Sequence, residues 1–445
     1  MLGEYRITGR RAAEIAASVE QGVGSGELAP GAALPPMREL AAELEVNPNT
    51  VAAAYRTLRE RGVIETAGRR GSRVRARPAS TAREALRVEP PEWATDVSQG
   101  NPDPALLPPL GEALAAAAAR AARSPVFYGD EPVDPGLARA AAEAFAADGV
   151  PCGPDGIVLT SGSLDAIERV LAAHLKPGDT VAVEDPGWGS LLDLVPALGL
   201  RPVPLPLDDE GPLPDGLEQA LERGARAVVV TGRAQNPTGA AVSAARARAL
   251  REALARRPGV LVVEDDHGHG IVDLPLCTLA GATDRWALAR STAKAYGPDL
   301  RLAVLTGDAV TLDRVRGRQR LGPGWVSHLL QDAVAHLWHS RAVDPAAVAR
   351  AYGRRRDALV RELAGRGVPA YGRSGMNVWV PVADETGAVT ALLQSGWAAA
   401  PGARFRVASP PGIRLTVSPL DDVGIPRLAD SVAAAVRPAA PRRYA

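Results

Sequence analysis

The chain has 445 residues, too many for one compact core, and its 51 Lys and Arg side chains balance 51 Asp and Glu side chains, so any attraction to nucleic acid must be local. The two cysteines, Cys152 and Cys277, lack metal-ligand spacing and a partner pattern, which argues against a disulfide framework or a zinc site and favours the cytoplasm. No run of about 18 apolar residues occurs and the chain starts with charged residues, so we expect a soluble protein with no secretory signal and no membrane partner.

The first eighty residues have the pattern of a winged helix-turn-helix. Apolar residues at helical spacing, and the capping residue Asn47 before Pro48, indicate three helices, and two short strands around a glycine-containing turn follow them. Between Thr50 and Arg77 there are eight arginines and two glutamates, a net charge of 8 − 2 = +6. That charge favours phosphate contacts, and a solvated basic face is the alternative. The expected elements are helices over 10–21, 37–44 and 47–61 and strands over 63–66 and 73–75.

Three short stretches of this region resemble the winged helix of the GntR family of DNA-binding regulators: LPPMRELA at 34–41, NPNTV at 47–51 and AYRTL at 54–58, followed by GVI at 62–64. Many members of that family have arginine where this chain has Pro48, so the operator sequence of relatives does not transfer to it. The resemblance implies a double-stranded DNA operator as partner, contacted by Arg38, Asn47, Asn49, Thr50, Arg69, Arg70 and Arg73.

Prolines without a sustained apolar period indicate an exposed linker over residues 77–95. The chain is therefore expected to divide into a winged helix-turn-helix domain over 1–76, this linker, and a body over 96–445. Within the body we expect a large subdomain over about 96–320 and a small one over about 321–445.

From residue 156 onward, short apolar runs alternate with helical stretches, which predicts an α/β fold with a largely parallel sheet buried on both faces. In such sheets ligands bind beyond the carboxyl ends of the strands. The expected strands cover 157–160, 181–184, 227–231, 260–264, 286–289 and 302–306.

Polar motifs follow these predicted strands. A Ser-Gly-Ser-Leu turn that ends in Gly162, Ser163 and Leu164 opens a helix and offers free N–H groups to a phosphate. Trp188 presents a flat indole that suits ring stacking or core filling, and Asn236 offers an amide. The strand that ends in Glu-Asp-Asp-His places carboxylates where burial demands a cationic partner.

Only two lysines are present, Lys176 and Lys294, and arginine cannot replace lysine in a Schiff base. Lys176 precedes Pro-Gly at a predicted helix end, which is ordinary capping. Lys294 ends the stretch Ser-Thr-Ala-Lys, with Ser291 before it and Arg301 seven residues on. A primary amine near a hydroxyl and a fixed cation is what a Schiff base and a phosphate dianion require.

The order of these motifs resembles that of fold-type I aminotransferases of class I/II, which depend on pyridoxal 5'-phosphate (PLP), from about Asp96 to Val436. The resemblance implies a large and a small domain of that fold, PLP as cofactor, and no metal. We choose Asp265 over Asp266 as the pyridine partner because residues alternate along a strand. The implied roles are Lys294 for the Schiff base, Asp265 for the pyridine nitrogen, Asn236 for the ring hydroxyl oxygen, Trp188 for stacking, Gly162, Ser163, Leu164, Ser291 and Arg301 for the phosphate, Tyr128 of the neighbouring subunit joining them, and Arg414 for a ligand carboxylate.

One position departs from that family. His267 stands where the family usually has a tyrosine that touches the ring oxygen, so we place His267 near the cofactor and expect it to change the proton inventory there.

A GntR-type winged helix joined to an aminotransferase-like body is the arrangement of the MocR subfamily of bacterial regulators, and the N-terminal stretches look closest to the types linked to vitamin B6 control. The resemblance implies a homodimer whose DNA binding responds to PLP, alone or as an aldimine with an amine, so that a small amine or a B6 vitamer is the effector. An active aminotransferase with an attached DNA-binding head is the alternative, which His267 disfavours. A third possibility, a scaffold without cofactor, requires Lys294 to be idle.

Overall fold

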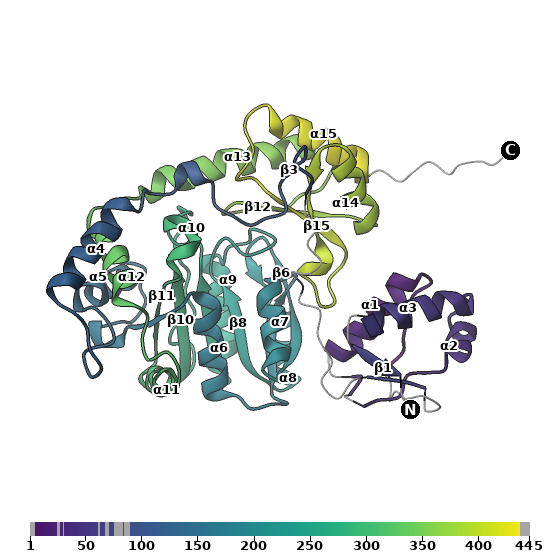
Figure 1. Cartoon of the computed structure of the whole chain (residues 1–445), viewed down its shortest axis with the longest axis horizontal. Helices are drawn as coiled ribbons and strands as arrows, with labels where there is room; N and C mark the ends of the chain where they lie inside the picture. Colours follow the sequence, from purple (N-terminus) through teal and green to yellow (C-terminus); the bar gives the residue numbers. More distant parts are fainter. Residues whose placement is uncertain are drawn as a thin grey trace.

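The computed structural model of this chain describes residues 5–24, 27–29, 31–60, 63–66, 71–74, 83 and 90–436. Figure 1 shows a small N-terminal unit, which we call the head, beside a larger α/β unit, the body. Among the described residues, no helix is both long and apolar enough to cross a membrane.

The head has the expected three helices and a two-stranded antiparallel wing. Asn47 explains where the third helix starts, because its side-chain Oδ1 accepts a hydrogen bond from the backbone N–H of Asn49 at 2.8 Å. A separate apolar core, which includes Ile15, Tyr55 and Leu58, holds the helices together. The elements are α1 (Ala12–Gly24), α2 (Met37–Glu43), α3 (Pro48–Glu60), β1 (Ile64–Thr66) and β2 (Ser72–Val74).

The body is built on an eight-stranded sheet of order β4-β11-β10-β9-β8-β5-β6-β7. Neighbours from β10 to β6 are parallel, whereas β11 is antiparallel to both of its neighbours, so the expectation of a largely parallel sheet is confirmed. The strands are β4 (Val158–Thr160), β5 (Thr180–Asp185), β6 (Arg201–Asp208), β7 (Gly211–Pro212), β8 (Ala225–Thr231), β9 (Leu261–Asp266), β10 (Arg285–Ser291) and β11 (Ala303–Gly307).

Alternate residues of the central strands enter two different cores. On β5, Val181 and Val183 belong to one apolar cluster and Ala182 to the other, and β8 divides in the same way. Helices α6, α7 and α11 cover one face, and α5, α8 and α9 are among those on the other (Figure 1). The helices around the sheet are α4 (Gly111–Arg123), α5 (Pro135–Ala147), α6 (Ser163–His174), α7 (Gly189–Ala197), α8 (Pro214–Glu222), α9 (Ala244–Ala255), α10 (Ala293–Tyr296), α11 (Ala309–Arg320) and α12 (His328–His339).

The C-terminal part of the body forms a smaller layer around a three-stranded sheet of order β12-β15-β14. The first strand of the body, β3 (Thr95–Asp96), pairs with β13 (Trp397–Ala398) of this layer, whereas α12 packs against α4 and α5. The two layers therefore interleave in sequence and do not divide simply near residue 320. The remaining elements are α13 (Pro345–Gly365), β12 (Asn377–Pro381), α14 (Glu385–Gln394), β14 (Ala400–Pro401), β15 (Gly412–Thr416) and α15 (Gly424–Val436).

Candidate functional site

The expected site residues come together at one edge of the large sheet. Strands β5, β8, β9 and β10 are parallel, so their carboxyl ends meet there, and β4 ends beside them because it is antiparallel to β11. Asp265 lies within β9, and Ser163, Trp188, Asn236 and Lys294 follow the carboxyl ends of β4, β5, β8 and β10.

Lys294 lies on the short helix α10 that follows β10, and its amine donates to the backbone carbonyl of Gly100. Burial and the nearby positive charge of Arg414 lower the pKa of Lys294 from 10.5 to about 8, although Asp265 acts in the opposite direction. A lysine with such a pKa is partly neutral near physiological pH, so it can act as a nucleophile.

Asp265 is the penultimate residue of β9 and is 3% exposed. One carboxylate oxygen, Oδ2, lies 2.6 Å from Nδ1 of His267, and the other, Oδ1, is buried without a hydrogen-bond partner among the described residues. An unpartnered buried carboxylate oxygen is costly unless a ligand supplies a donor.

His267 is turned toward protein groups. Its Nε2 donates to the carbonyl of Ala234 at 2.8 Å, and its Nδ1 faces Asp265. Burial disfavours the charged ring, but the Asp265 carboxylate outweighs burial and raises the pKa of His267. Because both neighbours are acceptors, the geometry favours an imidazole that carries both protons. Both of its nitrogens thus have protein partners, and His267 braces Asp265.

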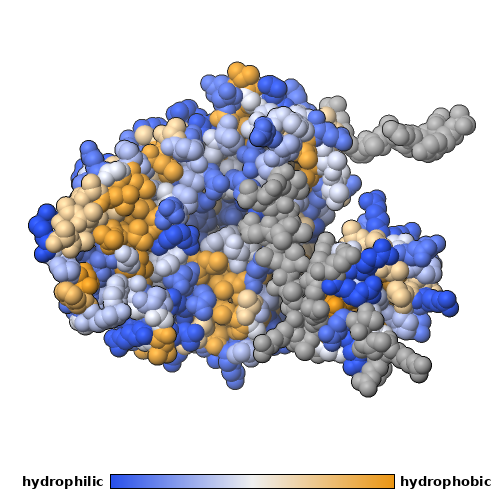
Figure 2. Space-filling view, viewed as in Figure 1, coloured by the Kyte–Doolittle hydropathy of each residue, from blue (hydrophilic) through white to orange (hydrophobic). Residues whose placement is uncertain are grey.

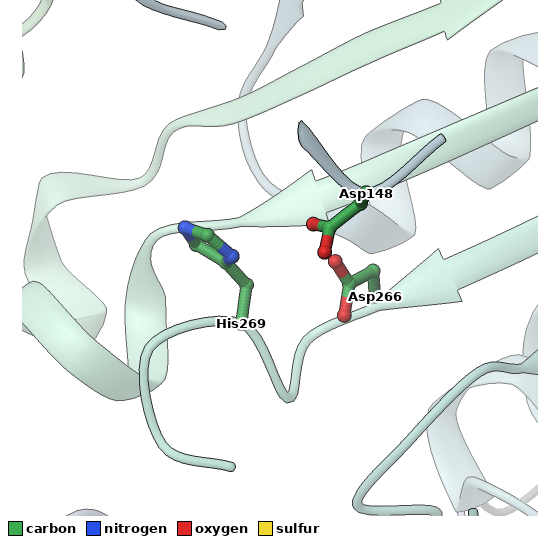
Figure 3. A group of neighbouring side chains, drawn as sticks. All are labelled: Asp148, Asp266 and His269. Carbon is green, nitrogen blue, oxygen red and sulfur yellow. The ribbon is translucent and has the colours of Figure 1, made fainter. Parts of the chain in front are cut away.

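Asp266 belongs to a different cluster, with Asp148 and His269 (Figure 3). Arg233 Nε and Arg290 Nε each donate to the buried Asp266 carboxylate at 2.8 Å. Burial opposes its charge, but Arg290 and Arg233 hold the pKa of Asp266 below its usual range. Ligand atoms of Asp148, Asp266 and His269 lie within 4.8 Å of one another, yet two guanidiniums already neutralise the two carboxylates. The cluster is therefore best explained as a buried ion network beneath the site.

The turn after β4 lies against Arg301. Gly162 has φ +99° and stands directly before α6, and a Cβ there would lie 2.9 Å from Nη2 of Arg301, so only glycine fits without strain. Ser163, in the first turn of α6, has a buried Oγ with no partner among the described residues, and Leu164 follows it. Arg301 Nη2 donates to the carbonyl of Ser161 at 2.9 Å.

Ser291 and Trp188 are two further expected site residues. Ser291, at the end of β10, is 6% exposed, and its Oγ accepts from the N–H of Ala293 at 3.1 Å. Trp188 precedes α7 and is half-buried against the apolar cluster under that helix. Both thus lie on elements that border the candidate site.

Arg414 on β15 reaches into the site from the smaller layer. Its Nη1 donates to Oδ1 of Asn236 at 2.8 Å, and its Nη2 donates to the carbonyl of Ser98. The sequence analysis missed the segment from Ser98 to Gly100, whose carbonyls hold both Arg414 and Lys294. The Gly-Asn-Pro stretch that begins at Gly100, after β3, was a signal that could have found it.

Tyr128 stands apart from the other expected residues. Its side chain is 94% exposed and packs edge to face on Trp325, with ring centroids 5.6 Å apart. Because this side chain faces solvent, any role in the site would require a second copy.

In the head, Arg38 on α2 and Asn49 at the start of α3 are exposed, and Thr50 and Arg73 are half-buried. The Oδ1 of Asn47 is used to cap α3. The expected DNA contacts Arg69 and Arg70 lie outside the described residues.

The set of groups fits a ligand with a protonated ring nitrogen, a phosphate and an electrophilic carbon. Asp265 and Ser163 each have a buried side-chain oxygen without a partner among the described residues. These oxygens suit the ring nitrogen and the phosphate, and the Lys294 amine suits the electrophilic carbon.

Residues 95–432 match the family model for aminotransferase class I and II, and residues 11–74 match that for bacterial regulatory proteins of the gntR family. The chain is 42% identical over 435 residues to the vitamin B6 salvage pathway transcriptional repressor PtsJ of Salmonella typhimurium, covering 96% of this chain and 98% of that protein. It is 31% identical over 314 residues, 66% of each chain, to the HTH-type pyridoxine biosynthesis transcriptional regulator PdxR of Corynebacterium glutamicum.

Solved structures show the same fold for the body. The aspartate aminotransferase from Rhizobium meliloti matches with a TM-score of 0.69 at 23% identity, covering 77% of this chain and 91% of that chain. An archaeal alanine:glyoxylate aminotransferase matches with a TM-score of 0.68 at 22% identity, covering 77% and 90%. At these identities the likeness establishes architecture only.

Proposed function

This chain belongs to the aminotransferase class I and II family and carries a gntR-family head, the architecture of MocR-type regulators, and from that premise we propose that it is a bacterial transcriptional regulator whose binding to operator DNA responds to PLP. The observation that carries the proposal is the union of both units in one chain, matched over 96% of its length by a relative named as a vitamin B6 salvage repressor. Because PLP is the active form of vitamin B6, we assign this regulator to B6 control in the cytoplasm.

The proposed units are the DNA-binding domain at 1–76, the linker at 77–95 and the PLP-binding body at 96–445. When bound, PLP supplies an aldehyde that reacts reversibly with primary amines. Lys294 is the residue we assign to hold it, supported by the lowered pKa of its amine. Asp265 Oδ1 is suited to accept the proton of the ring nitrogen, because it is buried and lacks a partner among the described residues.

The other roles follow from position. The N–H groups at the start of α6 and the guanidinium of Arg301 would neutralise the phosphate, and Arg414 would bind the carboxylate of an amino effector. The remaining proposed contacts are Gly162, Ser163, Leu164 and Ser291 at the phosphate, Trp188 over the ring and Asn236 at the ring hydroxyl oxygen.

A working aminotransferase is the second candidate, and it is favoured by the electrostatic coupling of Lys294 to both Asp265 and Arg414. The imidazolium of His267 argues against it. The positive charge of His267 beside Asp265 makes that carboxylate a weaker partner for a protonated ring nitrogen, and the protonated ring is what draws electrons from a bound amine. Turnover of a panel of amino donors at about 1 per second or faster would favour the enzyme.

A homodimer is part of the proposal. Exposed apolar side chains lie at the end of the body that carries α4, where Figure 2 shows apolar residues gathered: Leu114 is 45% exposed, Phe127 66% and Leu321 89%. Such a surface is suited to burial against a second copy, which would receive Tyr128 at its phosphate cradle. Two heads would then contact paired half-sites through Arg38, Asn47, Asn49, Thr50, Arg69, Arg70 and Arg73.

The shared site has a direct test. Lys294→Ala and Tyr128→Ala subunits are each expected to lose tight PLP binding as homodimers. Because mixed dimers would contain one intact site, mixing the two variants should restore part of the binding. Mixtures that bind no more PLP than the separate variants would argue against the contribution of Tyr128.

The function itself is tested by fluorescence anisotropy on a duplex selected in vitro from random DNA. PLP is expected to change the operator affinity by about fivefold or more, the usual range of coupling between sites. Lys294→Ala should remove both this change and the visible absorption of bound PLP. Lys176→Ala is the matched control, because Lys176 is the one other lysine. It is exposed and precedes β5, so it lies at the amino end of that strand and not at the carboxyl end, where the site is. Equal operator affinity with and without PLP would refute the proposal.

A further inference from the structure

Residues Gly402 to Ser409, which we call the 402–409 segment, are bound tightly to the turn that carries Trp188. The Asp185 carboxylate accepts backbone N–H groups of Val407, Ala408 and Ser409 at 2.9, 2.7 and 2.8 Å. The segment therefore moves with the carboxyl end of β5.

The first turn of α7 fixes the same segment. The N–H of Gly187 donates to the carbonyl of Phe405 at 2.6 Å. A Cβ on Gly189 would lie 2.6 Å from the carbonyl oxygen of Arg404, so the two backbones touch with no room for a side chain. Any shift of α7 is thus transmitted to the segment.

The other side of the segment faces the proposed effector position. The guanidinium of Arg414 lies 4.6 Å from the centre of the Phe405 ring, and Arg406 Nε donates to Glu385 of α14 at 2.6 Å. The segment thus joins β5 and α7 of the large sheet to α14 and β15 of the smaller layer.

Arg83, a linker residue, is bound to this junction. Its backbone N–H donates to Oδ2 of Asp193 on α7 at 2.6 Å and its Nη1 donates to Oδ1 at 2.8 Å. Its Nη2 approaches the carbonyl of Arg406 at 3.5 Å. The two side chains are only 27% and 22% exposed, so this ion pair is better shielded than a surface pair. From the head itself, Gln21 on α1 donates to the carbonyl of Val407 at 3.4 Å.

We propose that the surface formed by α7 and the 402–409 segment is the docking surface for the interdomain linker, and that the Arg83–Asp193 pair is the anchor through which ligand binding changes the placement of the head. The inference rests on the proposed function and names its route of regulation. A ligand shifts an equilibrium only when it binds one arrangement better. Here the docked arrangement and the effector position share the 402–409 segment, so a ligand that moves Phe405 or Trp188 changes how well Arg83 can dock.

The test compares Arg83→Ala and Asp193→Ala with Arg256→Ala, a control that breaks an ion pair with Glu218 of α8 and none with Arg83 or Asp193. The readout is the ratio of operator affinities with and without PLP, and PLP affinity is measured separately by visible absorption. Both anchor variants should bring the ratio close to one while PLP affinity stays within about twofold, whereas Arg256→Ala keeps the wild-type ratio. The charge-reversed pair Arg83→Asp with Asp193→Arg should regain part of the ratio, because a merely structural loss would not be rescued. Anchor variants that keep the wild-type ratio would overturn the inference.

A second readout needs no DNA and separates this inference from the proposed function. Trypsin cleavage between head and body is timed with and without PLP, in wild type and in Asp193→Ala, which leaves every cleavage site in place. Faster cleavage in Asp193→Ala, at a rate that PLP no longer changes, supports the anchor even if PLP does not change the operator affinity of the wild type. Identical cleavage in the two proteins would reject the anchor while leaving the regulator proposal standing.

Discussion

Attachment of PLP to Lys294 should follow the ionisation of that amine. Burial first, and then the charge of Arg414, lower its pKa from 10.5 to about 8. The difference, 10.5 − 8 = 2.5 pH units, makes the neutral amine about 300 times more abundant at neutral pH than it is in an ordinary lysine. We therefore expect PLP to label Lys294 rapidly at neutral pH.

The assay is stopped-flow absorption after mixing PLP with protein between about pH 6 and pH 10. The rate should rise about tenfold per pH unit and level off above a midpoint near pH 8, because only the neutral amine attacks the aldehyde. Arg414→Gln removes the second cause of the shift and should move the midpoint upward. Asp265→Asn removes the opposing charge and should move it downward.

The control is the Lys294→Ala protein, which should lose the reaction whose midpoint lies near pH 8. A wild-type midpoint near the ordinary lysine value would show that burial does not act on this amine as the structure implies. A midpoint that Arg414→Gln leaves in place would refute the assigned electrostatic cause.

Four further outcomes are expected. Asp266→Ala should lower the free energy of unfolding in urea by about 3–5 kcal/mol, because it removes the buried carboxylate that two guanidiniums share and leaves Asp148 alone to balance both charges; a loss below about 1 kcal/mol would contradict the ion network. Gly162→Ala should weaken PLP binding in absorption titrations without loss of folding, since the new Cβ would press on Arg301. Arg38→Ala should weaken operator binding and reduce the salt slope by about one if it contacts a phosphate. The raised pKa of His267 means that its contribution to stability is complete below its ordinary pKa near 6.5 and is lost as pH rises through the folded value; His267→Asn, a neutral donor, should flatten that loss in urea titrations across pH.

Much of the fold could be predicted from sequence because the central strands are buried on both faces. Runs such as Val-Val-Val before Thr231 have no polar alternation, and this pattern distinguishes a covered parallel sheet from a surface hairpin. The same logic located the site, since polar residues directly after such runs must lie at the carboxyl edge. Lys294 was found by its rarity among 51 basic residues.

Strand β6 was missed for a physical reason. Its prolines at 202, 204 and 206 indicate a loop, because proline cannot donate to a ladder. In the structure β6 pairs along its length with β5, but only its last two residues pair with β7. Prolines can therefore occupy alternate positions of β6, because the N–H that each proline lacks would point to the side of the strand that is mostly unpaired.

Side-chain partners were the other limit. The sequence placed His267 beside the cofactor by analogy with a tyrosine, but a shorter ring with two nitrogens finds two nearer acceptors, Asp265 and the carbonyl of Ala234. The Arg83 anchor was also invisible, since Asp193 is 110 residues away and nothing in the linker's composition indicates a bound residue. The composition of the linker predicts that it is exposed, whereas a single ion pair depends on which residue the fold places beside Arg83.

The pair Asp265 and Asp266 shows what the alternation of side chains along a strand predicts and what it leaves open. Successive residues of β9 point to opposite faces, so one carboxylate had to face the site and the other the layer behind it. The sequence did not predict that Asp266 would meet Arg290, its register partner on β10, or that Arg290 would also bind Asp148, 142 residues away. Two carboxylates and two guanidiniums cancel in that network, so it adds little net field above it. This is consistent with Lys294, whose pKa responds to Asp265 and Arg414 and not to the larger cluster beneath them.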